Sequence, residues 1–431
     1  MSDRKTFFIK SMGCKSNQFE GDLIVENLEK AGYKRTLDMS CADYYILNSC
    51  SVTHKSDTET FYLLRNAKHK YPNIKTIITG CVAQIEKEQL LENDYIDYVF
   101  GNDDKFKMAE LLKQNDSVVS DIMDLKTFNY QVLEDTRKTR FSLKIQDGCN
   151  NRCAYCIIPF ARGKSRSASS EFVVEQINKA YEHGFKEVVF TGIHIGQWGI
   201  DIQKSLIDLL KDVERYTDIP RFRLGSLNPL EFTPELLDFL EGSKKFCNHF
   251  HLSLQSACNK TLNSMNRFYT VEDYLLQIED MAKRFNNPFI GCDIITGFVG
   301  ETESDFATTV ENLKKSKLTK IHTFPYSVRK GTQAEKMEGH LPSQIKQERA
   351  EIVKSISKEN YEKFLESNIG SVHELLIEKR PDKHKNILKG VTRNYLDVLI
   401  DGVEPSAEYF NTLRQIKIEK VDTSSIYGTF I

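Results

Sequence analysis

Short apolar runs alternate with amphipathic segments of helix length along the N-terminal part of the chain. The runs at residues 5–12, 44–48 and 76–79 have the length and composition of buried strands. Residues 21–31 have the apolar spacing of a helix. Strands interleaved with helices are typical of a parallel sheet that is covered on both faces. The pattern therefore predicts an α/β domain with a doubly wound parallel sheet.

A second series of strand-like runs begins near residue 141. Helical patterns fill most of the gaps between these runs, including residues 170–183 and 271–285. Repeated strand–helix units form barrels whose functional groups gather at the carboxyl ends of the strands. The pattern predicts a partial (β/α)6 barrel. We expect its six strands at residues 142–146, 187–192, 221–226, 249–255, 292–298 and 320–327.

The pattern changes again toward the C-terminus. Residues 344–364 are charged, with an apolar helical stripe, and predict a connecting helix. Beyond residue 370, the segments 374–379, 389–401, 412–421 and 427–431 read as short strands joined by turns, which favours a small β-barrel. We place the domains at residues 1–135, 136–369 and 370–431.

Composition narrows the class of protein. A chain of 431 residues exceeds what one hydrophobic core usually organises, and its formal net charge of -2 argues against a strongly basic nucleic-acid coat. Neither a secretory signal nor an apolar run long enough to span a bilayer is visible, so we expect a cytoplasmic protein without membrane contact. Ten cysteines in such a protein are better explained by metal ligation or core packing than by disulfides.

Three cysteines follow the three predicted strands of the first domain. These are Cys14, Cys50 and Cys81. Ligands of open parallel sheets collect outside the carboxyl ends of the strands, so these three side chains are expected to converge. The alternative is that they are small buried residues at strand ends. Four other cysteines fit no comparable pattern and are interpreted as packing residues: Cys41, Cys247, Cys258 and Cys292.

A denser cysteine motif lies directly after the first strand of the second series. Cys149, Cys153 and Cys156 form a CxxxCxxC loop. Three thiolates on one loop can hold three irons of a [4Fe–4S] cluster and leave the fourth iron without a protein ligand. A structural zinc site needs a fourth ligand, and neither Cys nor His follows closely in sequence. The alternative of ordinary cysteines in a turn is much weaker for this spacing.

This loop resembles that of the radical S-adenosylmethionine (SAM) superfamily. The resemblance implies that SAM chelates the open iron and that an electron from the cluster cleaves it to a 5′-deoxyadenosyl radical. It also implies that Tyr155 packs near the adenine. Residues after successive strands would then contact SAM or shape its pocket: Gly192 and His194, Ser226, Gln255 and residues 297–302. His194 as a core histidine and Ser226 as a turn residue are the plainer alternatives.

The sequence motifs around the other three cysteines, at residues 13–18, 48–53 and 79–84, resemble those of the methylthiotransferase family. The resemblance covers nearly the whole chain. The resemblance implies that Cys14, Cys50 and Cys81 bind an auxiliary [4Fe–4S] cluster. It also implies two SAM molecules per turnover: one methylates sulfur on that cluster, and the other gives the radical that activates the target C–H bond. An electron donor such as a flavodoxin or ferredoxin and a sulfur source are implied as partners.

Family members modify either tRNA or a ribosomal protein. The last domain carries basic residues typical of phosphate binding, and its setting resembles the RNA-binding TRAM barrel. These residues are Lys379, Arg380, Lys383, Lys385, Lys389 and Arg393, against the single acid Asp382. Past the cysteine loop, Arg162, Lys164 and Arg166 are expected to meet phosphates or a substrate carboxylate, or else to be exposed residues at a helix start.

The local motifs look most like the branch that acts on N6-threonylcarbamoyladenosine at position 37 of tRNA. The implied product is 2-methylthio-N6-threonylcarbamoyladenosine, and the implied partner is the anticodon stem-loop. Methylthiolation of isopentenyladenosine or of a ribosomal protein is the alternative within the class, and a non-enzymatic zinc-bearing RNA-binding protein is the distant one. Ala257 and Val299 stand where the family commonly has Gly and Pro, which bears on loop shape and removes no ligand.

Overall fold

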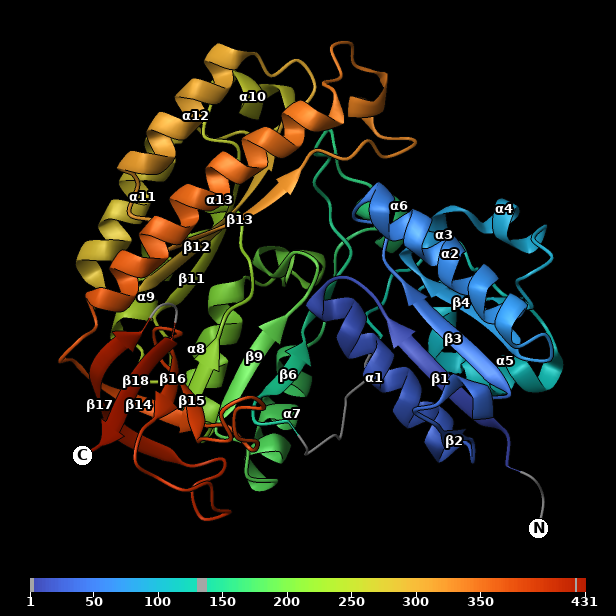
Figure 1. Cartoon of the computed structure of the whole chain (residues 1–431), viewed down its shortest axis with the longest axis horizontal. Coiled ribbons are helices and arrows are strands. Elements are labelled where there is room, and N and C mark those ends of the chain that lie inside the picture. The colour runs from blue at the N-terminus through green and yellow to red at the C-terminus, as the bar shows by residue number, and fades with distance from the viewer. Residues whose placement is uncertain (1–3, 130–137, 423–424) are drawn as a thin grey trace.

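The computed structural model describes residues 4–129, 138–422 and 425–431, which form three parts (Figure 1). We call them the N-terminal sheet, the central barrel and the C-terminal barrel. The N-terminal sheet lies beside one edge of the central barrel, and the C-terminal barrel lies below the central barrel in this view. The expected domain boundary between residues 135 and 136 falls outside the described residues. In the described part of the chain, no helix is both long and apolar enough to cross a membrane.

The N-terminal sheet is parallel throughout, with strand order β2-β1-β3-β4-β5. Helices cover both of its faces, because alternate residues of β3 point to two separate cores. α1 and α5 pack on one face and α2 on the other. The predicted doubly wound sheet is confirmed. Its elements are β1 (Thr6–Ser11), α1 (Lys15–Lys30), β2 (Lys34–Arg35), β3 (Tyr44–Ser49), α2 (His54–Lys70), β4 (Lys75–Gly80), α3 (Cys81–Ile85), α4 (Lys87–Leu91), β5 (Tyr98–Val99) and α5 (Met108–Gln114).

Helix α1 begins at Lys15, six residues before the start expected from its apolar spacing. Its first turns are polar, yet Ser16, Asn17 and Glu20 are buried. The amide of Asn17 donates hydrogen bonds to the carbonyls of Met12, at 2.8 Å, and Asn48, at 3.1 Å. These polar residues therefore face the interior, where they fix the ends of the strands.

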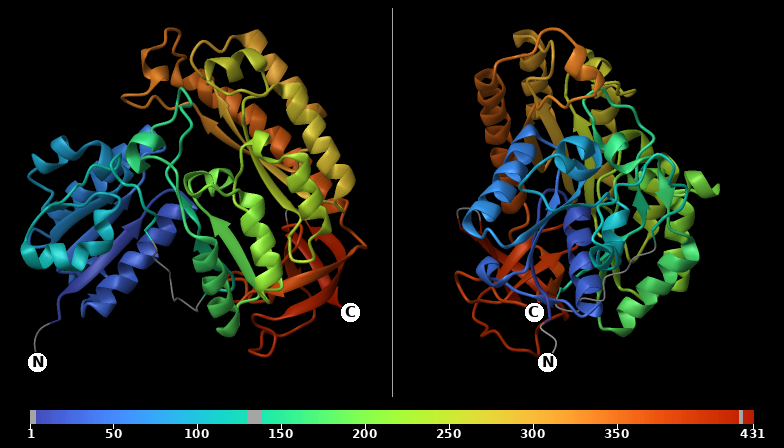
Figure 2. Two further views of the ribbon diagram at one scale, coloured as in Figure 1. Left: turned by 180° about the vertical axis from the view of Figure 1, so that it is seen from behind. Right: turned by 90° about the vertical axis from the view of Figure 1, so that its right-hand side faces the viewer.

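The central barrel consists of two three-stranded parallel sheets, β6-β9-β10 and β11-β12-β13. Isolated bridges from Phe222 to Phe246 and from Leu227 to Leu252 place the two sheets side by side. The helices lie outside the strands (Figure 2), which confirms the predicted partial (β/α)6 barrel. The strands are β6 (Phe141–Lys144), β9 (Glu187–Thr191), β10 (Arg221–Arg223), β11 (His249–Gln255), β12 (Phe289–Thr296) and β13 (Lys320–Pro325). The main outer helices are α7 (Ser170–Glu182), α8 (Leu206–Tyr216), α9 (Pro234–Gly242), α11 (Val271–Arg284), α12 (Glu303–Lys315) and α13 (Ser343–Glu366).

The C-terminal barrel is closed, with strand order β14-β15-β16-β18-β17. The small β-barrel predicted for this part of the sequence is therefore confirmed. It packs against the amino-terminal ends of the central strands. His249, the first residue of β11, lies with its ring 4.4 Å from that of Tyr395. Phe289 of β12 shares the apolar core of the C-terminal barrel. The strands are β14 (Val372–Ile377), β15 (Lys389–Thr392), β16 (Asp397–Ile400), β17 (Leu413–Asp422) and β18 (Ser425–Phe430).

Candidate functional site

The N-terminal cysteine trio lies at the carboxyl ends of three adjacent strands. Cys14 precedes α1, Cys50 follows β3, and Cys81 opens α3 after β4. The backbone amide of Cys14 lies close enough to the Cys50 thiol to lower its pKa. Gly13, with φ at +80°, permits this approach, because a Cβ there would lie 2.2 Å from the Cys50 Sγ. The fold thus brings together thiols that are far apart in sequence.

The ionisation of these thiols also reports their proximity. Burial, with the neighbouring charges of Cys81 and Cys14, raises the pKa of Cys50 to about 11. Burial raises the pKa of Cys14 as well, the Arg162 guanidinium opposes the rise, and Cys81 adds to it. Thiols in such a site lose their protons when a metal centre binds, because thiolates are the metal ligands.

The second trio lies on the loop between β7 (Gln146–Asp147) and α6 (Ile158–Arg162). Gln197 accepts a hydrogen bond from the backbone amide of Asn150 at 2.9 Å and so holds the start of the loop. Gln146 accepts from the backbone amide of His194 at 2.7 Å, which ties the segment after β9 to the same loop. Burial and the neighbouring Cys153 raise the pKa of Cys156 to about 12.

Two polar side chains contact the sulfur atoms of this loop. The His194 Nδ1 lies 3.2 Å from the Cys149 Sγ, and its Nε2 pairs with Glu231. Burial alone would lower the pKa of His194, but the hydrogen bonds with Cys149 and Glu231 raise it to about 10. Arg267 approaches Cys153, with its Nη1 3.5 Å from the Sγ. Sequence reasoning missed Glu231 and Arg267, which belong to no short motif and reach the loop only through the fold.

The other residues that the sequence singles out fall around this loop in different settings. Tyr155 packs edge-on against Phe298, and burial raises its pKa. Gln255 has a φ of +70° at an irregularity in the pairing of β11, a conformation that costs about 1–3 kcal/mol for a residue other than Gly. Ser226 is exposed after β10, and the Gly192 carbonyl accepts a hydrogen bond from Ser16 at 3.2 Å. Their roles toward a cofactor stay predictions.

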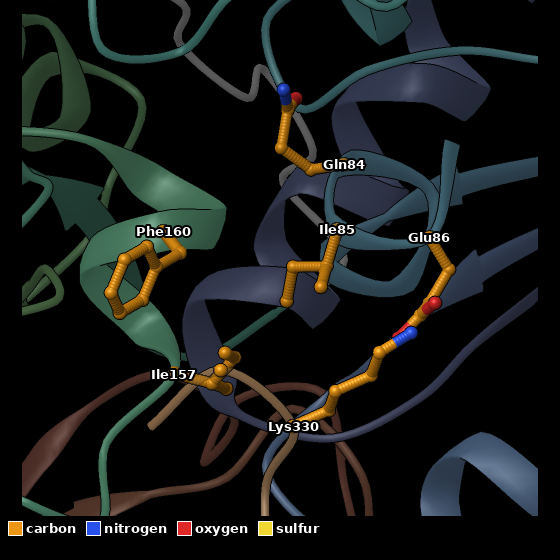
Figure 3. A pocket seen from close by; sticks show the side chains of 7 residues that line it. Gln84, Ile85, Glu86, Ile157, Phe160 and Lys330 are labelled. Atoms are coloured by element: carbon orange, nitrogen blue, oxygen red, sulfur yellow. The ribbon is translucent and has the colours of Figure 1, made fainter. Parts of the chain in front are cut away.

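The elements that carry the two trios pack against each other. Asn102, whose amide lies 3.9 Å from the Cys81 Sγ, donates to the Ala161 carbonyl of α6 at 2.7 Å. Arg329, after β13, donates to Ser51, the residue that follows Cys50, at 2.7 Å. A cavity of about 330 Å³ lies between α3 and α6, and Ile85 and Ile157 point into it from its two walls (Figure 3). The two trios therefore share one junction between the N-terminal sheet and the central barrel.

A buried group of charges supports this junction. We call it the Glu20 cluster: Glu20, Lys105, Lys144, Asp147, Arg162 and Arg166. Glu20 of α1 pairs with Lys105 and with Lys144 of β6, each at 2.6 Å, and with Arg162. Burial would raise the pKa of Glu20, but these three cations hold it well below its usual range.

The cluster corrects the expectations for Arg162 and Arg166. Their side chains are only 1% and 4% exposed, so they are neither surface residues at a helix start nor open to RNA phosphates. Arg162 pairs with Glu20, and Arg166 lies 3.5 Å from Asp147. A contact with RNA would require these buried ion pairs to break, which is strongly unfavourable.

The donor sets of both trios fit [4Fe–4S] clusters. Each offers three thiols, and none of the other four cysteines lies at either site: Cys41 lies beside Asp38, Cys247 beside Glu187 and Cys258 beside Asp305, and Cys292 is buried in the barrel core. Among the described residues, no group of three or more His, Cys, Asp or Glu side chains is drawn together around a single metal ion. Three thiols at each site suit a cluster with one open iron.

The predicted RNA-binding residues of the C-terminal barrel divide into two groups. Arg393 is engaged at the central barrel: its guanidinium pairs with Glu374 at 2.9 Å and donates to the Lys244 carbonyl at 3.0 Å. Lys389 is half-buried and lies 3.9 Å from Asp382. Arg380 and Lys383 are exposed. The basic surface is thus smaller than the sequence suggests, since Arg393 holds two parts of the chain together.

Comparison with known proteins assigns the regions around both trios. Residues 6–101 match the model described as "Uncharacterized protein family UPF0004", and residues 143–313 match the radical SAM superfamily. The threonylcarbamoyladenosine tRNA methylthiotransferase MtaB of Bacillus subtilis is 32% identical over 99% of this chain and 96% of its own length. The tRNA-2-methylthio-N(6)-dimethylallyladenosine synthase of Lachnoclostridium phytofermentans is 31% identical over 93% and 90%. The radical SAM methyltransferase TsrM from Kitasatospora setae shares the fold, with a TM-score of 0.54 over 74% of this chain and 73% of its own, at 14% identity.

Proposed function

The chain belongs to the radical SAM methylthiotransferase family, and from that premise we propose that it converts N6-threonylcarbamoyladenosine at position 37 of tRNA to its 2-methylthio derivative, with two SAM per product. It is a tRNA methylthiotransferase that uses two [4Fe–4S] clusters and SAM. When bound, these cofactors supply the electron, the radical and the transferred sulfur. The protein supplies binding, orientation and exclusion of water.

The observation that carries the proposal is the shared junction of the two trios. We assign Cys14, Cys50 and Cys81 to the auxiliary cluster and Cys149, Cys153 and Cys156 to the radical cluster. The hydrogen bonds from Asn102 to Ala161 and from Ser16 to Gly192 support this assignment, because they fix both groups of elements against each other. A fixed geometry is what group transfer between two centres requires.

The residues around the second trio are assigned to SAM. Tyr155, Gly192, His194, Ser226 and Gln255 surround the carboxyl ends of the central strands, where barrels of this type carry out their chemistry. The Glu231 carboxylate orients the His194 ring. Arg267 and His194 each place a polar group beside a cysteine sulfur, and hydrogen bonds to sulfur tune the potential of such clusters.

The choice of nucleoside rests on the local sequence motifs and on the name of the Bacillus subtilis relative. The relative from Lachnoclostridium phytofermentans, named for dimethylallyladenosine, is almost as similar and keeps that nucleoside as the alternative. We further propose that a flavodoxin or ferredoxin supplies electrons and that a separate donor replenishes sulfur. Residues 1–135, 136–369 and 370–431 would then be the auxiliary-cluster, radical and RNA-binding domains.

The test is anaerobic turnover of reconstituted enzyme with two matched anticodon stem-loops. One carries N6-threonylcarbamoyladenosine and the other carries isopentenyladenosine at position 37. We expect the methylthio product and 5′-deoxyadenosine, measured by mass spectrometry, with the first RNA only. Product formation with the second RNA alone would contradict the proposed substrate.

A further inference from the structure

A second cavity, of about 570 Å³, lies where all three parts of the chain meet. We call it the junction cavity. Lys15 and Arg35 line it from the N-terminal sheet, Thr191 from the central barrel, and Arg380 and Tyr395 from the C-terminal part. It extends from Thr191, at the carboxyl end of β9, to Tyr395, which stacks at the amino-terminal ends of the strands. Its volume suits a modified nucleoside, since ligand cavities of roughly 300–1,000 Å³ hold small molecules.

The cavity is strongly cationic. Seven of its lining residues are Lys or Arg, and the only acid among them is Glu378. Three of the cations are offset: Lys138 by Asp22, Arg140 by Glu378 and Arg223 by Glu187. Within the described residues, Lys15, Arg35 and Arg380 take part in no ion pair. Lys15 and Arg380 are exposed and Arg35 is partly exposed, so the lining retains positive charge that favours an anionic ligand.

One end of the cavity reaches the reaction site. Lys15 directly follows Cys14, and Thr191 directly precedes Gly192. Ser16, the next residue of α1, donates a hydrogen bond to the Gly192 carbonyl at 3.2 Å, which places the start of α1 beside the segment that follows β9. The Thr191 hydroxyl is buried and has no hydrogen-bond partner among the described residues. A buried hydroxyl in this position can hydrogen-bond to a polar group of a ligand.

We propose that the junction cavity binds the threonylcarbamoyl group of the substrate nucleotide, with its carboxylate against Lys15, Arg35 and Arg380 and its ureido group at the Thr191 hydroxyl. This rests on the proposed function and names the residues that select its substrate. A carboxylate neutralises the three cations, whereas an uncharged dimethylallyl group would cover them without compensation. The cavity thus selects for the charged nucleoside and against the apolar one.

The cations of the cavity could bind either of two anions, the carboxylate of the threonylcarbamoyl group or a phosphate of the RNA. Binding of three anticodon stem-loops to the reconstituted holoenzyme separates the two sources. The first RNA carries threonylcarbamoyladenosine, the second its carboxamide analogue, and the third plain adenosine. For the double variant Arg35→Gln/Arg380→Gln, we expect about tenfold weaker binding of the first RNA and less than a twofold change for the other two.

Arg65→Gln is the matched control, an exposed arginine on α2 of the same sheet that does not line the cavity, and it should leave all three affinities unchanged. Arg35→Lys/Arg380→Lys should retain most of the binding, which guards against a folding defect. An equal loss for all three RNAs would identify a phosphate site and overturn the carboxylate assignment. No loss for any RNA would also overturn it.

The outcome is separable from that of the proposed function, because binding and turnover are measured independently. If the wild-type enzyme methylthiolates threonylcarbamoyladenosine but the double variant binds it normally, only the cavity assignment fails. If the wild-type enzyme modifies isopentenyladenosine alone, the proposed function fails and the cavity assignment fails with it.

Discussion

Two buried carboxylates join the central barrel to its neighbours, and their surroundings differ. Glu20 lies at the junction with the N-terminal sheet, in a cluster of four cations and two acids. Glu187 lies at the junction with the C-terminal barrel, where it pairs with Arg221 and Arg223. Arg221 also donates a hydrogen bond to the Val391 carbonyl at 3.1 Å, and Arg223 donates to the Thr392 carbonyl at 3.1 Å.

The two junctions differ in the partners that their buried cations find within the chain. At the Glu187 junction, backbone carbonyls of β15 accept hydrogen bonds from both guanidiniums, and the Arg221 Nη1 lies 3.9 Å from the Glu374 carboxylate. At the Glu20 junction, two positive charges remain in excess, and Arg162 acts on the thiols of Cys14 and Cys81. Buried charge without a counterion is unfavourable, and the thiolates and anionic cluster that we propose for this site would supply the missing negative charge. On the proposed ligand assignment, the Glu20 junction includes a cofactor, whereas the Glu187 junction is formed by the chain alone.

The largest contrast is expected between two buried cysteines, one at each junction. Cys50→Ala should abolish methylthiolation and remove about four of roughly eight irons, because it deletes a proposed ligand of the auxiliary cluster. Cys247→Ala, beside Glu187, should keep all the iron and most of the activity. Iron analysis and product mass spectrometry of anaerobically purified protein measure both. Equal iron contents in the two variants would break the comparison.

A second pair of variants distinguishes the roles of the two cysteine trios. Cys153→Ala should abolish SAM cleavage, measured as 5′-deoxyadenosine, because a cluster with two ligands does not hold the reactive geometry. Cys50→Ala should still cleave SAM and lose only sulfur insertion. Identical behaviour of the two variants would show that the assigned division of labour is wrong.

Neutralising the two carboxylates should also have unequal consequences. Glu20→Gln and Glu187→Gln each leave buried cations unpaired and should each destabilise the protein by roughly 3–5 kcal/mol in denaturant unfolding. Only Glu20→Gln should also shift the reduction potential or the EPR signal of the auxiliary cluster, since Glu20 acts on the Cys14 thiol and Glu187 adjoins only Cys247. A spectroscopic change in Glu187→Gln would remove the distinction.

Acid should weaken the Glu187 junction in a defined pH range. Burial opposes ionisation of Glu187, but Arg223 and Arg221 lower its pKa from 4.5 to about 2. The contribution to stability, roughly 3 kcal/mol, is present above pH 4.5 and is lost as the pH falls from 4.5 toward 2, because the unfolded chain binds the proton first. Across that range, metal-free wild type should lose roughly 3 kcal/mol more stability than metal-free Glu187→Gln, because the other carboxylates with lowered pKa values, such as Glu20, titrate in both proteins.

The smallest effects are expected in the C-terminal barrel. Arg393→Ala should destabilise the protein by about 1–3 kcal/mol, because it removes hydrogen bonds to Glu374 and to the Lys244 carbonyl across the second junction. Lys389→Ala, whose partner Asp382 is 3.9 Å away near the surface, should change stability by less than about 0.5 kcal/mol. Thermal unfolding measures both, and a larger effect for Lys389 would contradict the assignment of Arg393 as the link.

The sequence predicts what is encoded locally. Strand–helix alternation predicts both α/β parts, and the position of cysteines after strands predicts the convergence of Cys14, Cys50 and Cys81. It does not reveal which polar residues are inside. The start of α1 and the burial of Arg162 depend on partners such as Glu20 and Lys144, which are distant in the chain. Arg267 and Glu231 escape detection for the same reason, since only the folded barrel brings them to the cysteine loop.

The spacing of the two trios along the chain bears on how the enzyme matures. Cys149, Cys153 and Cys156 occupy one short loop, so a nascent chain already presents three neighbouring thiols to an iron carrier. Cys14, Cys50 and Cys81 are separated by whole helices, and only the pairing of β1, β3 and β4 assembles them. Delivery of the auxiliary cluster therefore has to follow folding of the sheet, and a defect in that folding would yield a half-loaded protein.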